Sequence, residues 1–261
     1  MGSTRFPGKP LAPLLGRPMI EHVFRRATAC DVLDAVYIAT CDDEIRLAAE
    51  AFGGKTIMTS AAHERASDRV AEAAEMIELS GGSRSDIVVM IQGDEPMITP
   101  SMIEMAVAPI LIDPAISCVN LVRRIYTRAD QEDPNTIKVV MNMQRDALYF
   151  SRAPIPQCDW GSDGSLPVFK QVCVIPFRRD FLSEFSKLAP TPLEKAESID
   201  MLRALEHGRR VHLVETKIDS HAVDTVEDLI LVEGLMKEDA ASITEPSAVA
   251  PAARGMSGDK A

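Results

Sequence analysis

Apolar residues along this chain follow two alternating patterns, one with the period of a helix and one typical of buried strands. Residues 87–91 (IVVMI) are apolar throughout, as expected for a central parallel strand that is covered on both faces. Such runs alternate with helical patterns up to about residue 122, which predicts an α/β fold with a doubly wound, mostly parallel sheet. Strands are expected at residues 35–40, 56–58, 87–91 and 116–122, and helices at residues 19–27, 42–52, 70–77 and 100–112.

The second half of the chain has a different pattern. Residues 136–142 and 147–150 predict a β-ribbon, and residues 157–167, rich in Gly, Ser and Asp, predict a mobile loop. Residues 239–261 are small and polar and lack periodicity, which predicts a disordered tail after a single domain over residues 1–238. Further strands are expected at residues 169–177 and 211–216, and helices at residues 179–188, 193–206 and from Thr225 onward.

The composition narrows the function. Hydrophobic residues make up 46% of the chain, and the net charge of −11 disfavours a nucleic-acid-binding surface, which needs a basic face. No apolar run is long enough for a membrane span, and the five scattered cysteines contain no CxxC pair. We therefore expect no nucleic-acid or membrane partner, and the cysteine usage fits a reducing cytoplasm.

The first eleven residues, MGSTRFPGKPL, form a polar loop directly before an amphipathic helix. Glycine lets the backbone approach an anion and cations neutralise it, so this composition is typical of a phosphate-binding loop, with Arg5 and Lys9 as its cations. In α/β folds such a loop follows a buried strand. Either the protein dispenses with this strand, or Met1 is an internal methionine and the strand is encoded upstream; we expect the second.

A second candidate site follows the strand at residues 87–91. There the sequence QGDEP (residues 92–96) brings adjacent carboxylates to the carboxyl end of the strand, where open α/β sheets bind ligands. Mg²⁺ binds one or two protein carboxylates together with substrate phosphates, which makes Asp94 a candidate ligand, although Gly-Asp is also common in solvated turns. Asp224, at the start of the last predicted helix, is a second candidate; taken alone, helix capping explains it better.

Three further charged residues have a structural explanation beside a functional one. Asp68 opens a helix, a position that favours a bound phosphate or ribose but also fits an ordinary charged first turn. Lys138 lies in an otherwise apolar strand and either binds a substrate anion or reaches out to water. Arg152 suits a carboxylate ligand, with a surface ion pair as the alternative.

Several segments occur in the order found in one enzyme family. They are STRFPGKPL, GRPMIEHV, DRVAEA, IQGDEP, DPNTIKVV, ALYFSRAPIP, TPLEKAESIDMLRALEHG and VDTVEDL. Together, over roughly residues 2–236, they resemble the 3-deoxy-manno-octulosonate (KDO) cytidylyltransferases. The segments GKPL and QGDEP occur across nucleotidyltransferases, whereas DPNTIKVV followed by ALYFSRAPIP is more specific to this family.

The resemblance implies a Rossmann-like nucleotidyltransferase fold and a reaction in which CTP and a 2-keto sugar acid give the CMP-sugar acid and pyrophosphate. It also implies a homodimer formed through a subdomain at about residues 123–177. A cytoplasmic role in lipopolysaccharide or capsule polysaccharide biosynthesis follows from the same resemblance. The implied site residues are Arg5 and Lys9 on the triphosphate, Asp94 and Asp224 on Mg²⁺, Asp68 and Gln92 near the nucleotide, and Arg152 and Glu197 near the sugar acid, with Lys9, Asp94 and Asp224 catalytic.

The chain departs from the family pattern at three points. Family members carry a strand ending in Ile-Pro-Ala-Arg ahead of the first loop, and Arg65-Ala66-Ser67 stands where they have Ser-Gly-Thr. In the sugar-binding strand, Gln171 and Ile175 replace a His and a Tyr. A pocket without those polar groups suits a different hydroxyl pattern, so the expected acceptor is KDO or a related acid. The alternatives are a cytidylyltransferase for another acidic acceptor, such as a nonulosonic acid or a phosphonate, and a catalytically impaired nucleotide-binding relative.

Overall fold

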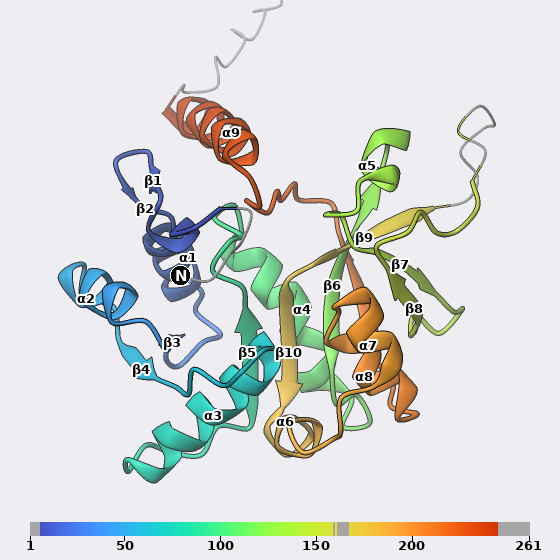
Figure 1. The fold of residues 1–261 in the computed structure, drawn as a ribbon, viewed down its shortest axis with the longest axis horizontal. Helices are drawn as coiled ribbons and strands as arrows, with labels where there is room; N and C mark the ends of the chain where they lie inside the picture. Colours follow the sequence, from blue (N-terminus) through green and yellow to red (C-terminus); the bar gives the residue numbers. More distant parts are fainter. Residues whose placement is uncertain (1–5, 159, 161–166, 245–261) are drawn as a thin grey trace, which may run out of the picture.

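The computed structural model describes residues 6–158, 160 and 167–244 of the chain (Figure 1). At its centre, β5 (Ile87–Ile91) and β10 (Val174–Arg178) form an antiparallel pair. β10 also lies against β6 (Val119–Ile125), which belongs to a five-stranded sheet with the order β11-β6-β9-β7-β8. In this sheet β6 runs parallel to β11 (His212–Thr216) and antiparallel to β9 (Val168–Val172).

Two further strand pairs lie on opposite sides of this centre. β7 (Lys138–Met141) and β8 (Ala147–Ser151) are antiparallel and end the five-stranded sheet, which confirms the predicted β-ribbon. β3 (Ile38–Thr40) and β4 (Thr56–Met58) form a parallel pair on the other side of β5 (Figure 1). Among the described residues, β3 makes no ladder with β5.

Helices cover both faces of the central strands, as a doubly wound fold requires. Alternate residues of β5 divide between the two faces: Val88 and Met90 pack with Phe177 and Phe181, whereas Val89 packs with residues of α1 and α4. The helices and the remaining short strands are α1 (Met19–Thr28), α2 (Asp43–Ala51), α3 (Ala66–Leu79), α4 (Pro100–Ile112), α5 (Arg128–Glu132), α6 (Arg179–Phe185), α7 (Pro192–Glu197), α8 (Met201–Glu206), α9 (Val226–Thr244), η1 (Lys9–Leu11), β1 (Pro13–Leu14) and β2 (Arg17–Pro18).

The structure divides two elements that the sequence pattern predicts as continuous. The strand expected at residues 169–177 is β9 and β10, because Cys173 ends pairing with β6 and the following residues pair with β5. The helix expected at residues 193–206 is α7 and α8, because Ser198 adopts a left-handed conformation with φ 56°. Apolar periodicity continues across both breaks, so the sequence pattern does not reveal them.

The two ends of the predicted domain also differ in detail from expectation. α9 continues to Thr244, so residues 239–244, expected to belong to the tail, are helical. The rest of the predicted tail, and most of the loop predicted at residues 157–167, lie outside the described residues. None of the helices in the described ranges has the length and apolar content that crossing a membrane requires.

Candidate active site

Three charged residues from distant parts of the chain meet at the carboxyl end of β5. The ammonium of Lys9 donates to Asp94 Oδ2 at 2.7 Å and to Asp224 Oδ1 at 3.1 Å. Lys9 begins η1 directly after Gly8, whose φ of 74° lets the loop turn toward the sheet. Asp94 follows β5, and Asp224 precedes α9, where the side chains of Thr225 and Asp228 each accept from the other's backbone N–H and cap the helix.

The two carboxylates determine the charge state of Lys9. Burial on its own lowers the pKa of this ammonium, but the charges and hydrogen bonds of Asp94 and then Asp224 outweigh burial. The pKa of Lys9 therefore lies above its ordinary value, and the side chain is a permanent cation at neutral pH. Oδ1 of Asp94 is buried and has no hydrogen-bond partner among the described residues.

Glu95, which the sequence analysis did not single out, connects the loop that contains Asp94 to the segment that precedes Asp224. Its buried carboxylate accepts from the Cys173 backbone N–H at 2.9 Å and from the Ser220 hydroxyl at 2.6 Å. The backbone N–H of Val223 also donates to the carbonyl of Asp94 at 2.9 Å. Burial raises the pKa of Glu95, although both hydrogen bonds oppose the shift. The position of Glu95 next to Asp94 gives no sequence signal for this role, since adjacent acids are also common in exposed turns.

Arg152 and Glu197 meet at a second place, between β8 and α7. The Glu197 carboxylate accepts from the Ser151 hydroxyl and from the Arg152 backbone N–H, both at 2.8 Å. The Arg152 guanidinium donates to the carbonyls of Glu197 at 2.8 Å and Pro134 at 3.0 Å. In the described part of the chain no carboxylate forms an ion pair with Arg152, so its positive charge is not neutralised by a partner of its own.

Lys138 holds the backbone next to Arg152 in position. Its ammonium is fully buried and donates to the carbonyls of Arg152 at 2.6 Å and Asp133 at 2.7 Å. The pKa of Lys138 is lowered by burial, with the nearby Asp133 charge acting in the opposite direction. The structure supports neither alternative for Lys138: the side chain is fully buried and does not reach water, and two of its three N–H donors go to backbone carbonyls near Arg152.

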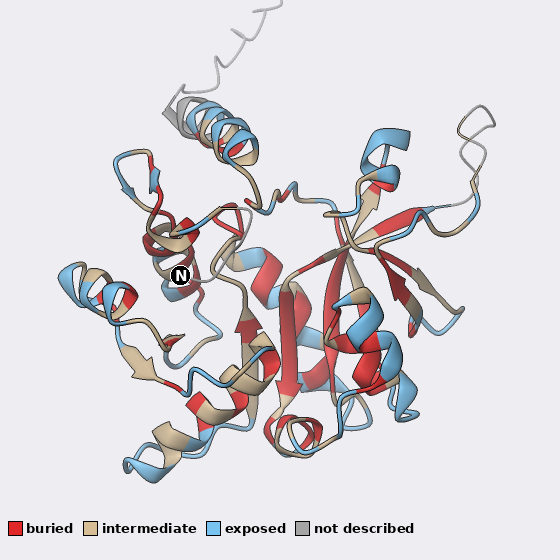
Figure 2. Cartoon of the chain, viewed as in Figure 1, coloured by how far each residue is buried: buried red, intermediate tan, exposed pale blue. Residues whose placement is uncertain are grey.

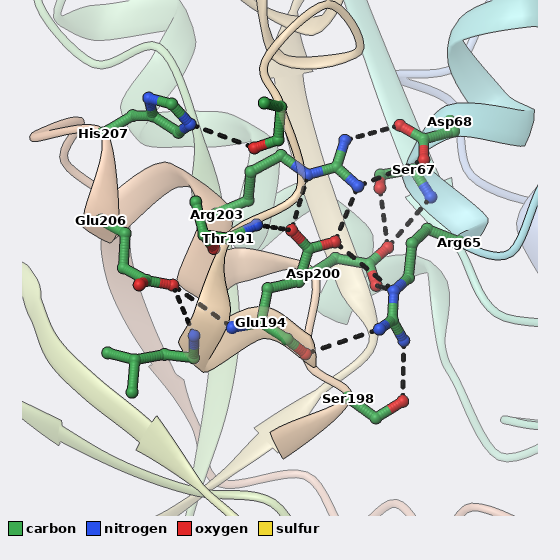
Figure 3. Close-up of polar contacts among 12 residues, drawn as sticks. Arg65, Ser67, Asp68, Thr191, Glu194, Ser198, Asp200, Arg203, Glu206 and His207 are labelled. Carbon is green, nitrogen blue, oxygen red and sulfur yellow. Dashed lines mark hydrogen bonds and ion pairs between the residues drawn. The ribbon is translucent and has the colours of Figure 1, made fainter. Parts of the chain in front are cut away.

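Asp68 belongs to a separate charged network (Figure 3). Arg203 is 1% exposed and donates to both carboxylate oxygens of Asp68, at 2.8 and 3.2 Å, and to both oxygens of Glu194, at 2.7 and 2.9 Å. Ser67 donates to Asp200 in the same network. These contacts join the start of α3 to α7 and α8. The sequence signal for a buried Arg203 is the apolar stretch around it, which the motif-based reasoning passed over.

The remaining predicted site residues lie in different environments. Gln171 is in β9, and its side-chain amide donates to Asn120. Ile175 is 2% exposed and packs in the core on the α3 and α6 face of β10. Gln92 follows β5 beside Asp94, and its backbone N–H donates to the carbonyl of Cys173 at 3.3 Å. Arg5 lies outside the described residues.

Known proteins similar to this chain include several cytidylyltransferases. A 3-deoxy-manno-octulosonate cytidylyltransferase of Geobacter metallireducens is 44% identical over 236 residues, which cover 87% of this chain and 91% of the relative. An enzyme of the same name from Solibacter usitatus is 43% identical over 235 residues, which cover 90% of each chain.

Solved structures agree with these relatives. A CMP:2-keto-3-deoxy-manno-octonic acid synthetase complexed with CTP is 38% identical, with a TM-score of 0.80 over 91% of this chain and 95% of that chain. A 4-diphosphocytidyl-2C-methyl-D-erythritol synthase from Anaerococcus prevotii, 12% identical with a TM-score of 0.55 over 89% of this chain and 94% of that chain, shares the fold alone. A family model described as cytidylyltransferase matches residues 1–216. These matches confirm the predicted α/β fold, and the chain belongs to the cytidylyltransferase family of nucleotidyltransferases.

Proposed function

We propose that this protein transfers CMP from CTP to KDO and releases pyrophosphate. The observation that carries the proposal is the contact of Lys9 with both Asp94 and Asp224. One ammonium and two carboxylates at the end of a central strand suit a nucleoside triphosphate and a divalent cation. The choice of KDO rests on relatives of that activity that are 44% and 43% identical to this chain.

The donor set fits Mg²⁺ as the cofactor. Oδ1 of Asp94 is buried without a hydrogen-bond partner in the described structure, which leaves an oxygen that a hard cation suits. The described residues contain no cluster of three or more His, Cys, Asp or Glu that would enclose a metal, so Asp94 and Asp224 would share the ion with substrate phosphates. When bound, Mg²⁺ neutralises charge that develops on the phosphate oxygens.

In the proposed reaction the anomeric hydroxyl of the sugar acid attacks the α-phosphorus of CTP, and pyrophosphate leaves. Lys9 holds the phosphates as a permanent cation, and Arg5 and Gln92 are the residues that the family resemblance assigns to the nucleotide. There is little covalent chemistry for the protein in such a transfer, so the residues act by positioning and by electrostatic stabilisation. A triphosphate that enters must compete for Lys9 with its two carboxylate partners, which keep the ammonium in place beforehand.

The acceptor is proposed to bind at Arg152. Its guanidinium contacts carbonyl oxygens and has no carboxylate partner in the described residues, so a substrate carboxylate supplies the missing negative charge. Glu197 orients Arg152 and can accept hydrogen bonds from sugar hydroxyls. Gln171 is the polar residue of β9 that the family resemblance assigns to the same pocket.

We also propose that the protein acts as a cytoplasmic homodimer that supplies an activated sugar for lipopolysaccharide. β8 ends the five-stranded sheet, and Leu148 on it is 59% exposed, which suits burial against a second copy. Light scattering of the protein and of Leu148→Lys tests this part. A lower mass for the variant supports a dimer through β8, and an unchanged monomer in both contradicts it.

The activity is tested by pyrophosphate release with CTP, Mg²⁺ and a panel of acids that includes KDO, a nonulosonic acid and a phosphonate. We expect release that requires KDO and that chelation with EDTA abolishes. Release with another acid but not with KDO would favour the alternative acceptors. Nucleotide binding without release on any acid would favour the impaired relative.

A further inference from the structure

Arg65 stands directly before α3, at a position where the family pattern has Ser. The residue at this place in a helix is usually Ser, Thr, Asp or Asn, because the side-chain oxygen accepts from the first backbone N–H groups. An Arg side chain has no acceptor and cannot cap the helix in this way. The Arg65 side chain is 18% exposed and extends away from α3 toward α7 (Figure 3).

The guanidinium of Arg65 contacts the end of α7 with three nitrogen atoms. Nη1 donates to the hydroxyl of Ser198 at 2.7 Å, and Nη2 donates to the carbonyl of Glu194 at 3.5 Å. Nε lies 3.4 Å from Oε1 of Glu194. Ser198 is the left-handed residue that ends α7, so the guanidinium spans the last turn of this helix and holds its carboxyl end.

The position of α7 depends on such polar contacts more than the position of α8 does. In α8, Met201, Leu202 and Ala204 are buried in the core. In α7, every residue of which the structure describes, only the acid Glu194 is buried, and Figure 2 shows exposed residues in pale blue along this helix. A helix without a buried apolar stripe is stabilised by its ion pairs and hydrogen bonds. Arg203 supplies these for Glu194 in the first turn of α7, and Arg65 supplies them at the other end.

The carboxyl end of α7 also carries the residue that contacts Arg152. Glu197 directly precedes Ser198, and its carboxylate accepts from the Arg152 backbone N–H and the Ser151 hydroxyl, both at 2.8 Å. The carbonyl of Glu197 accepts from Nε of Arg152 at 2.8 Å. A displacement of Ser198 therefore moves the acceptors that orient the Arg152 guanidinium.

We propose that Arg65 is a positioning residue for the acceptor: by holding Ser198, it keeps Glu197 where Glu197 orients Arg152. This role rests on the proposed function, in which Arg152 binds the acceptor carboxylate. Arg65 is not a catalytic residue, because its donors are directed at Ser198 and Glu194. The acceptor carboxylate binds Arg152 in the same way before and during the reaction. Loss of its positioning should therefore raise KM for the acceptor and leave kcat and KM for CTP nearly unchanged.

Arg65 also contributes charge to the network of Figure 3. Together with Arg203 it faces the carboxylates of Asp68, Glu194 and Asp200, so Arg65→Met should lower stability as well as affect the acceptor. Ser198→Ala separates the two effects. It removes the hydroxyl next to Glu197 and keeps the Arg65 charge beside the carboxylates.

The test is steady-state kinetics of pyrophosphate release with CTP and KDO. We expect Arg65→Met and Ser198→Ala each to raise KM for KDO by about 5- to 10-fold, with kcat and KM for CTP within about twofold of the wild type. Because the two substitutions break one contact, the double variant should be no worse than Arg65→Met alone. Arg46→Met, which removes a cation paired with Asp43 and Glu50 on α2, should change none of these constants.

A conservative variant tests whether charge alone is enough. Arg65→Lys keeps the charge but lacks the planar fork that reaches Ser198 and Glu194 together. We expect its stability to lie near that of the wild type and its KM for KDO to lie between those of the wild type and Arg65→Met. A fall in kcat in the Arg65 and Ser198 variants, or an equal rise of both KM values, would overturn the proposal.

Hydrogen exchange reads the same positioning without any substrate. The Arg152 amide donates to Glu197, so its exchange should become about 10-fold faster in Ser198→Ala. The Ala147 amide of the same strand donates to the carbonyl of Val211 and should be unaffected. If the wild type releases no pyrophosphate with KDO, the proposed function fails and exchange alone decides. Selectively faster exchange at Arg152 would still support positioning by Arg65, and unchanged exchange would overturn it.

Discussion

The hydroxyl of Ser220 donates a hydrogen bond of 2.6 Å to Glu95, across 125 residues of sequence. Ser220 lies four residues before Asp224, and Glu95 lies next to Asp94. This buried contact, together with the bond from Val223 to the Asp94 carbonyl, keeps the two aspartates in reach of one ammonium.

Removing this contact should affect both stability and turnover. Ser220→Ala leaves the buried Glu95 carboxylate with one donor fewer, which should cost about 1–3 kcal/mol of unfolding free energy. Turnover should fall by about 10- to 100-fold through misplacement of Asp94 and Asp224. Urea unfolding and initial rates check this. Ser80→Ala removes an exposed hydroxyl of the same kind and should change stability by less than about 0.5 kcal/mol. Equal effects of the two substitutions would contradict the role of Ser220.

The aspartates themselves should matter for the chemical step. We expect Asp94→Asn and Asp224→Asn each to lower kcat by about 10³-fold or more and to leave the folded structure intact, because each removes a charge that balances the transferring phosphate and its cation. Rates at saturating Mg²⁺ and circular dichroism measure the two effects. The exposed Asp31→Asn is the control. A variant with nearly unchanged kcat would show that its aspartate is not needed.

The Arg203 network should be structural. Arg203→Met leaves Glu194 buried without its main partner, which should cost about 3–5 kcal/mol of unfolding free energy. Arg128→Met removes an exposed ion pair with Glu132 and should leave the unfolding free energy nearly unchanged. Denaturant unfolding of both variants makes the comparison. A similar decrease in unfolding free energy for both variants would show that the buried Arg203 pair stabilises the fold no more than an exposed pair does.

Stability should depend on pH through Glu78. The hydrogen bond from Arg179 holds the pKa of Glu78 below its ordinary value, so this group stabilises the fold above about pH 4.5 and less as pH falls through the lowered pKa. The unfolding free energy should therefore fall more steeply below that pH in the wild type than in Glu78→Gln. Urea titrations between about pH 3 and pH 6 test this. Glu75→Gln, on the exposed side of α3, controls for net charge, and parallel curves for wild type and Glu78→Gln would contradict the expectation.

Substitutions of Ile175 and Gln171 should have different effects, the first on stability and the second on acceptor kinetics. Ile175 is packed in the core, so Ile175→Tyr should destabilise the fold by about 1–3 kcal/mol through overpacking. Gln171→His should change kcat/KM for KDO with little change in Tm, because Gln171 is only partly buried. Thermal unfolding and acceptor kinetics on both variants decide the matter. If the Ile175→Tyr variant is as stable as the wild type and prefers a different acceptor, position 175 contacts the substrate and is not only a core position.

The apolar pattern predicts much of the local structure. The run at residues 87–91 is β5, the helix expected from Thr225 onward is α9, and the β-ribbon is present as β7 and β8. The same pattern misses the break at Cys173 and the turn at Ser198. Periodicity reports which residues face apolar surroundings, and those surroundings continue across both breaks.

The sequence by itself therefore determined the element types and, through its motifs, the family and the charged residues to examine. Only the tertiary structure decided which charges meet: Lys9 contacts Asp94 and Asp224 across 85 and 215 residues, whereas Asp68 is taken up by Arg203. It also decided that Ile175 is core and that β3 and β5 face each other across an apolar slot. The physical reason is that local patterns fix the faces of helices and strands, while contacts between distant segments depend on how those faces pack.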